Sequence, residues 1–141
     1  MTSSTFGASG TPTTVGPADY QPGVCNIGPA EIARRRRAGH IGLVAALALF
    51  AVLAAIDAPD WTRLLVAIPA IGAASGYIQA RLKFCAGFGS RGIFNFGDVG
   101  PTERVADDED RARDRARARQ IGAASIAIGL AAGVIAAVLP I

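Results

Sequence analysis

The stretch AGHIGLVAALALFAVLAAI, residues 38–56, decides the fold, because 19 consecutive positions carry no formal charge. As a helix rising 1.5 Å per residue it spans about 28 Å, close to the hydrocarbon thickness of a bilayer. Two further uncharged stretches follow, residues 64–80, which contain one proline and two glycines, and residues 120–141. Charged residues make up only 18% of the chain, and 141 residues leave too little sequence to cover three such helices in water. We therefore expect an all-α integral membrane protein with three transmembrane helices.

The basic residues predict the orientation of these spans, because arginine and lysine accumulate on cytoplasmic loops. Four arginines directly precede the first span: Arg34, Arg35, Arg36 and Arg37. Every other basic residue except Arg63 falls between the second and third spans. The turn between the first two spans is short and acidic and carries Trp61, an aromatic residue typical of membrane interfaces. We expect an N-in, C-out topology, with the four arginines and Trp61 in contact with lipid.

The polar segments divide the chain further. Residues 1–23 are rich in Ser, Thr, Gly and Pro and lack hydrophobic periodicity, which predicts a disordered cytoplasmic tail that a partner could order. Residues 24–90 contain the first two spans and form the predicted membrane hairpin. Residues 91–119 form a cytoplasmic loop and a charged helix, which leads into the third transmembrane helix at residues 120–141.

We expect the charged helix to begin near Pro101, since proline favours the first helical position. The pairs Asp107/Arg111 and Glu109/Arg113 place an acid four residues before a base, an order that stabilises a helix by roughly 0.2–0.5 kcal/mol per pair. The arginines of this helix are within reach of anionic lipid head groups. Nucleic-acid binding, which a pI of about 9.4 would otherwise suggest, is not expected because the topology accounts for the basic residues.

Small residues mark faces on which membrane helices can approach closely. Gly72 and Gly76 form a GxxxG step in the second span. Ser125, Gly129 and Gly133 form a longer stripe in the third span. We expect these faces to pack the second span on the third within one chain; the alternatives are a homo-oligomer and docking into a larger membrane complex.

The chain has two cysteines, Cys25 and Cys85, and one histidine, His40, which removes most metal and catalytic arrangements. Both cysteines fall on the cytoplasmic side of the predicted topology, where a structural disulfide is disfavoured because the cytosol is reducing. They are thiol candidates for a redox pair, a sulfur-carrying pair or two metal ligands. The simpler interpretation is two partly buried residues without chemistry. We expect no catalytic residues, no metal site and no cofactor.

Residues 84–97 alternate phenylalanine with glycine directly after the second span. Aromatic residues on a flexible backbone at the end of a membrane helix are typical of the membrane interface. We expect this segment to lie there.

The stretch from Cys25 through the arginines into the first span resembles the YgaP-like family of small inner-membrane proteins. The matching positions before the first span are Asn26, Ile27, Gly28, Glu31 and Arg34 or Arg35. Those around the second span are Trp61, Arg63, Leu64 and Leu65 at its beginning and Cys85 after its end. The resemblance covers about residues 25–90 and implies a short helical hairpin in the bacterial plasma (inner) membrane, without an assigned activity of its own. Some members carry a rhodanese domain, which handles sulfane sulfur, and this implies a link to sulfur chemistry.

These features predict a small multi-pass membrane protein that is a non-catalytic accessory or scaffold subunit of a membrane complex. Its expected partners are membrane lipids and either another protein in the membrane or a second copy of itself. The alternative is a thiol protein at the cytoplasmic face that handles sulfur or redox equivalents through Cys25 and Cys85. A transporter is disfavoured because the chain has few helices and no charged residue within the spans.

Overall fold

The computed structural model describes residues 19–141. Its elements follow the chain in this order: α1 (Pro29–Ala55), the 3₁₀ helix η2 (Asp60–Val66), α2 (Ala67–Leu82), α3 (Ala86–Arg91), β1 (Ile93–Phe94), β2 (Glu103–Arg104) and α4 (Asp108–Val138). Three helical segments are long and apolar enough to cross a membrane: Pro29–Ala55, Asp60–Leu82 and Asp108–Val138. The prediction of a mostly helical chain with three candidate transmembrane helices is therefore confirmed.

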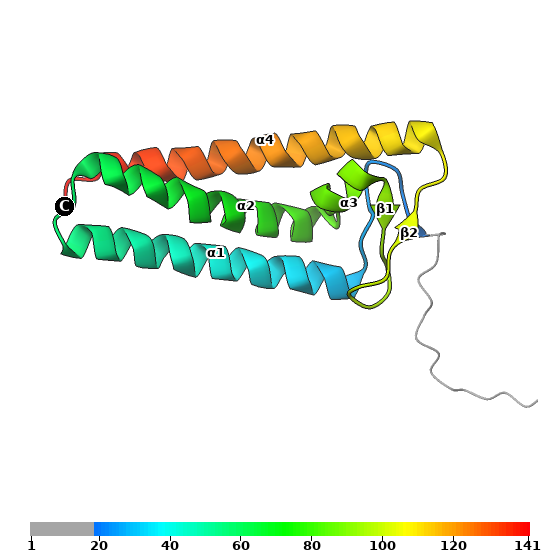
Figure 1. Cartoon of the computed structure of the whole chain (residues 1–141), viewed down its shortest axis with the longest axis horizontal. Coiled ribbons are helices and arrows are strands. Elements are labelled where there is room, and N and C mark those ends of the chain that lie inside the picture. The colour runs from blue at the N-terminus through cyan, green and yellow to red at the C-terminus, as the bar shows by residue number, and fades with distance from the viewer. Residues whose placement is uncertain (1–18) are drawn as a thin grey trace, which may run out of the picture.

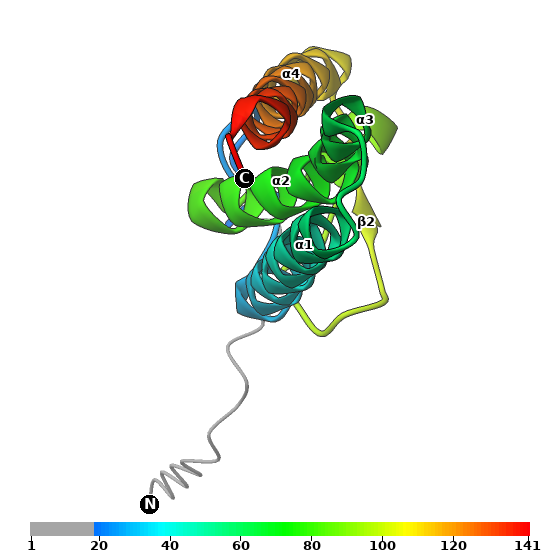
Figure 2. The same ribbon diagram turned by 90° about the vertical axis from the view of Figure 1, so that its left-hand side faces the viewer.

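The long helices form a single layer with α2 in the middle (Figure 1). α2 packs against both α1 and α4, whereas α1 and α4 make little contact with each other. Seen from the end, the three helices stand in a row (Figure 2). We call this row, α1, η2–α2 and α4, the helical layer. Residues 19–28 and 83–107 gather at the end where α1 and α4 begin, and we call them the head.

α1 begins well before its apolar stretch. Gly28 precedes the helix and Pro29 lies in its first turn, where the missing N–H of proline costs no helical hydrogen bond. Glu31 adds a negative charge near the positive end of the helix dipole. The helix has 27 residues and is about 40 Å long, so the four arginines lie on α1 itself.

The charged segment and the third apolar stretch form one continuous helix, α4. It begins at Asp108 and not near Pro101, so the predicted start is wrong. The reason is the side chain of Asp107, which caps the helix. It accepts hydrogen bonds from the backbone N–H groups of Glu109 at 2.8 Å and Asp110 at 3.1 Å.

The ion pairs on the first turns of α4 differ in one respect from the prediction. Arg113 pairs with Glu109 at 2.7 Å, as expected. Arg111 pairs with Asp108 and not with Asp107, because the Asp107 carboxylate is used as the helix cap.

The head contains a short antiparallel sheet, so the all-α prediction is incomplete. Its register pairs Ile93 with Arg104 and Phe94 with Glu103. Ile27, far away in the sequence, forms a parallel bridge with Asn95. The segment before α1 therefore runs alongside the segment that follows α3.

The aromatic residues after α2 fold into the head. Phe84 is fully buried, and Phe94 and Phe96 are 5% and 7% exposed. Phe94 stacks on Tyr20, with the ring centroids 4.9 Å apart, and also contacts Phe96. The prediction that this segment lies in the membrane interface does not hold for these rings, because their apolar surface is buried inside the protein.

The predicted disordered tail falls into two parts. Residues 1–18 lie outside the described residues, whereas the rest of it is folded into the head. The hydroxyl of Tyr20 donates to Asp114 Oδ2 at 2.8 Å, and the amide of Gly23 donates to Asp114 Oδ1 at 2.7 Å. The prediction of disorder is wrong for this second part, because Asp114, fully buried on α4, holds it in place.

Candidate functional site

Cys85 lies where α2 has ended and α3 begins, and it is only 2% exposed. Its sulfur accepts a hydrogen bond from Nη2 of Arg35 on α1 at 2.9 Å. It also accepts a longer one from the amide of Phe88 at 3.5 Å. A guanidinium beside a sulfur is a feature of reactive thiol sites, whereas deep burial keeps reagents away. Cys85 therefore has a positively charged neighbour, but reagents have poor access to its sulfur.

Asn26 fixes the backbone of Cys85. Its Oδ1 accepts from the Cys85 amide at 2.6 Å, and its Nδ2 donates to the Cys85 carbonyl at 3.1 Å. The main chain of Asn26 bonds to Lys83 on one side and to Asn95 on the other. Asn26 is fully buried, so every one of these polar groups would be costly to leave unpaired.

Gly28 allows the segments of the head to approach one another. Its amide donates to the Asn95 carbonyl at 2.9 Å. A Cβ at Gly28 would lie 2.5 Å from the carbonyl oxygen of Phe96, so a larger residue has no room. Residues 26–28 thus form a strap between the end of α2 and the strand β1, and we call it the Asn-Ile-Gly strap.

Glu31 and Arg35 form a buried charged pair next to Cys85. Glu31 is 1% exposed, and its carboxylate oxygens lie 3.7 Å from Arg34 Nη1 and 3.6 Å from Arg35 Nη2. Within residues 19–141, Oε2 of Glu31 and Nε of Arg35 have no hydrogen-bond partner. The Arg35 guanidinium also lies over the ring of Phe88, 5.8 Å from its centroid. Arg35 thus links a carboxylate, a sulfur and an aromatic face.

Cys25 has different surroundings. It is half-buried, packs in the cluster of Phe94, Phe96 and Val105, and directs its sulfur to the carbonyl of Ile27 at 3.7 Å. Burial raises the pKa of the Cys25 thiol, which makes it a weak nucleophile at neutral pH. Both cysteines are free, and their sulfurs have separate partners.

The structure gives no support to a metal centre in the part of the chain it describes. No group of three or more His, Cys, Asp or Glu side chains comes together within residues 19–141. His40 is exposed on α1, and its Nδ1 lies 2.6 Å from the hydroxyl of Tyr77 on α2. The histidine is therefore engaged with a tyrosine.

Three of the predicted packing residues lie at the contact between α4 and the second span. A Cβ at Gly129 would lie 2.6 Å from the backbone nitrogen of Ile71, and a Cβ at Gly133 would lie 2.8 Å from Cβ of Ala67. Ser125, on the same stripe, is 2% exposed. These small residues let α4 and α2 approach closely.

The GxxxG step of the second span is divided between two environments. Gly76 faces α1 and not α4, because a Cβ there would lie 2.7 Å from the carbonyl oxygen of Arg35. Among residues 19–141, no atom lies within 4 Å of such a Cβ at Gly72, which takes no part in either helix contact. The contact row on α2 runs instead through Ala73, which meets Gly42 of α1.

The residues predicted to touch lipid lie at opposite ends of the layer. Arg34, Arg36 and Arg37 are exposed at the start of α1, while Arg35 points into the head. Trp61, 70% exposed, lies in η2 at the far end.

The sequence does not predict the structural roles of two residues, Arg63 and Asp114, which each hold distant segments together. Arg63 is 3% exposed and donates to the carbonyls of Leu139 at 3.1 Å and Ile141 at 3.2 Å, which ties η2 to the end of α4. Asp114 anchors the start of the head. The available signals were that Arg63 is the one basic residue between the first two spans and that Asp114 is a lone acid among arginines.

Comparison of the chain with protein-family models, with curated proteins and with solved structures finds no match. The resemblance to the YgaP-like family therefore stays a prediction that rests on the quoted residues.

Proposed function

We propose that the chain is a multi-pass protein of the bacterial plasma (inner) membrane, oriented N-in, C-out, and that it acts without catalysis as an accessory or scaffold subunit of a membrane complex. Three apolar helices in one layer support the membrane assignment. The gathering of basic residues at the head end, with Arg63 and Trp61 at the other, supports the orientation.

The observation that carries the accessory role is that three buried polar side chains, those of Asn26 and Asn95 in the head and of Asp114 on α4, all make the hydrogen bonds that hold the head together. Both polar side-chain atoms of Asn26 form hydrogen bonds with the backbone of Cys85. Both carboxylate oxygens of Asp114 accept hydrogen bonds from Tyr20 and Gly23. The side-chain amide of Asn95 likewise uses both of its polar atoms: Nδ2 donates to the Asp98 carbonyl, and Oδ1 accepts from the Gly97 amide. A head held in this way has a fixed shape. Its surface is better suited to binding a partner protein than to catalysing a reaction.

Native mass spectrometry of the chain, gently extracted from the membranes of its own cells, tests this role. We expect a heteromeric assembly of defined stoichiometry with unmodified cysteines. The variant Gly28→Ala, which displaces the Asn-Ile-Gly strap, should lose the partner, while the matched variant Gly72→Ala in open space should keep it. A lone protomer or homo-oligomer in the wild type would contradict the proposal.

A second candidate function, thiol chemistry at the cytoplasmic face, is favoured by the 2.9 Å contact between Arg35 and the Cys85 sulfur. It predicts that sulfane sulfur or an oxidised adduct is found on Cys85 in cells and that Cys85→Ser removes it. Arg35→Gln should slow the reaction of Cys85 with iodoacetamide, and Arg37→Gln, two positions along the same helix, should not. Equal rates in these two variants would remove the basis of this candidate.

A further inference from the structure

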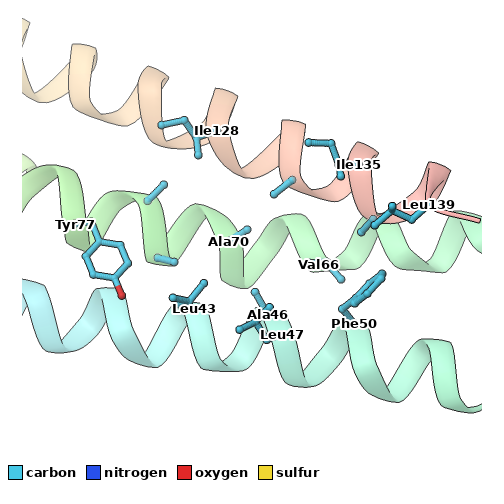
Figure 3. Close-up of a pocket in the computed structure, with 14 residues that line it drawn as sticks. Leu43, Ala46, Leu47, Phe50, Val66, Ala70, Tyr77, Ile128, Ile135 and Leu139 are labelled. Atoms are coloured by element: carbon cyan, nitrogen blue, oxygen red, sulfur yellow. The ribbon is translucent and has the colours of Figure 1, made fainter. Parts of the chain in front are cut away.

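One face of the helical layer is hollowed into an apolar groove. The groove has a volume of about 480 Å³, within the range of roughly 300–1,000 Å³ that ligand sites occupy. Its floor is α2, where Ala70, Ala73 and Ala74 leave room, and its walls are bulky side chains of α1 and α4 such as Leu47 and Ile135 (Figure 3). The groove exists because α1 and α4 both pack on α2 without closing on each other.

A second hollow continues from the groove toward the head. It has a volume of about 390 Å³ and is lined by Arg36, His40, Tyr77, Ala80 and Arg81. We call it the basic recess. Tyr77 lines both hollows and joins them. Within residues 19–141, neither Arg36 nor Arg81 is paired with a carboxylate, since the ion pairs there use other arginines.

The helical period places the two hollows on one face. On α1 the lining residues recur every three or four positions: Arg36, His40, Leu43, Leu47 and Phe50. On η2–α2 they do the same in the opposite direction: Arg81, Tyr77, Ala74 and Ala70 of α2, and Val66 at the end of η2. Residues with this spacing lie above one another on a helix. The face is therefore cationic at its head end, where Arg36 and Arg81 lie, and apolar along the rest of its length.

We propose that this face binds one anionic phospholipid, with an acyl chain in the apolar groove and the phosphate in the basic recess. The cationic mouth carries the argument, because an apolar helix from a partner would fill the groove but leave Arg36 and Arg81 without a counter-charge. Basic pockets between membrane helices on the cytoplasmic side are suited to anionic lipid head groups. The inference rests on the proposed membrane insertion and orientation, but not on the accessory role.

Tyr77 stands at the boundary between the polar and apolar parts of this site. Its hydroxyl lies 2.6 Å from Nδ1 of His40, and the two rings meet edge to face with centroids 5.3 Å apart. A Cβ at Gly39 would lie 3.0–3.1 Å from three atoms of the Tyr77 ring, so the ring is held tightly against α1. Tyrosine suits this position because its ring is apolar and its hydroxyl polar. We assign Tyr77 and His40 to positioning the head group.

Lipid retention measured by native mass spectrometry tests the site. The protein is reconstituted in nanodiscs that contain equal amounts of dioleoyl phosphatidylglycerol and dioleoyl phosphatidylcholine, and is then released by collisional activation. We expect one phosphatidylglycerol to be retained per chain in preference to phosphatidylcholine. The double variant R36Q/R81Q should retain it roughly thirty-fold less, which corresponds to about 2 kcal/mol for two arginines near the membrane surface.

Two control pairs separate the site from general effects. R91Q/R104Q removes two positive charges outside the recess and should retain the lipid as the wild type does. Ala132→Phe fills the groove from α4 and should displace the lipid, whereas Ala131→Phe, the preceding residue on the same helix and not part of the lining, should not.

The proposal is overturned if R36Q/R81Q and R91Q/R104Q retain the lipid equally, if the two lipids are retained equally, or if a second copy of the chain occupies the face in place of lipid. Failure of the chain to enter the nanodiscs would overturn the membrane assignment together with the site. In the native mass spectrum of the protein extracted from its own cells, a heteromeric assembly without bound lipid would support the accessory role and overturn the lipid site alone.

Discussion

The head and the helical layer are held together by different kinds of contact. The head depends on directional hydrogen bonds between segments far apart in the sequence, such as those between Asn26 and Cys85 and the one that the Gly23 amide donates to Asp114. The layer depends on small residues that bring helices into close contact, such as Gly76 against α1 and Gly129 against α2. The comparison teaches that a few hydrogen bonds set the shape of the head, whereas the volume of the side chains at the helix contacts sets the shape of the layer.

The largest effect is expected from Gly28→Ala in the head. The new methyl group would meet the Phe96 carbonyl oxygen at 2.5 Å and its Cα at 2.8 Å, so the Asn-Ile-Gly strap must move. We expect a loss of about 3 kcal/mol in the free energy of unfolding. Chemical denaturation in detergent measures it, and hydrogen exchange should show the loss in the head. A protein as stable as the wild type would show that the strap is not tightly held.

A somewhat smaller effect is expected from Gly76→Ala in the layer. Its methyl group would lie 2.7 Å from the Arg35 carbonyl oxygen and would push α1 away from α2. We expect about 2 kcal/mol of destabilisation, because helices can separate slightly where a strap cannot. Gly72→Ala on the same helix is the control and should cost nothing. Equal losses for the two variants would contradict the assignment of the α1–α2 contact.

Asp114 should make the head sensitive to pH in a way that the layer is not. Burial raises the pKa of this carboxyl above its ordinary value, although hydrogen bonds from Gly23 and Tyr20 oppose the shift. The folded protein therefore holds the proton more tightly than the unfolded chain, so this stabilisation is complete below the ordinary pKa and is lost as pH rises through the raised value.

We expect Asp114→Asn to remove this dependence, since its neutral amide still offers an oxygen to the Gly23 amide. Thermal unfolding of both proteins between about pH 4 and pH 7 measures the slope. The same slope in both proteins would mean that another group titrates.

The smallest effect is expected from Arg113→Gln on the exposed side of α4. Its ion pair with Glu109 is open to solvent on both sides, so we expect a loss of only about 0.3 kcal/mol. Repeating the unfolding measurement in high salt should abolish the difference, because salt screens exposed pairs. A loss above about 1 kcal/mol would show that Arg113 also supports the head.

Composition was sufficient to predict the three long apolar helices, because a charge-free stretch of membrane length has few other uses. The same reasoning placed Gly129 and Gly133 on a packing stripe. It could not tell that Gly72 and Gly76 have different neighbours, because a GxxxG step does not say which row of the helix a partner follows. In the structure the row runs through Ala73.

The head was beyond sequence reasoning for a physical reason. Asn26 and Cys85 lie 59 positions apart, and their pairing leaves no periodic signal in either segment. The alternation of phenylalanine with glycine has the composition of an interfacial segment, yet Phe94 and Phe96 find partners within the protein. Both Pro101 and Asp107 are start signals for a helix, and only the structure shows that α4 begins after Asp107.

The continuity of α4 has a mechanical consequence. The helix has 31 residues and is about 46 Å long, so it extends beyond a hydrocarbon core of about 30 Å. Asp114, which holds the start of the head, and Gly129, which touches α2, belong to the same rod without a break between them. In the proposed membrane topology, a change in bilayer thickness that tilts this rod would carry the head with it, and α4 would then transmit membrane strain to the surface proposed for a partner.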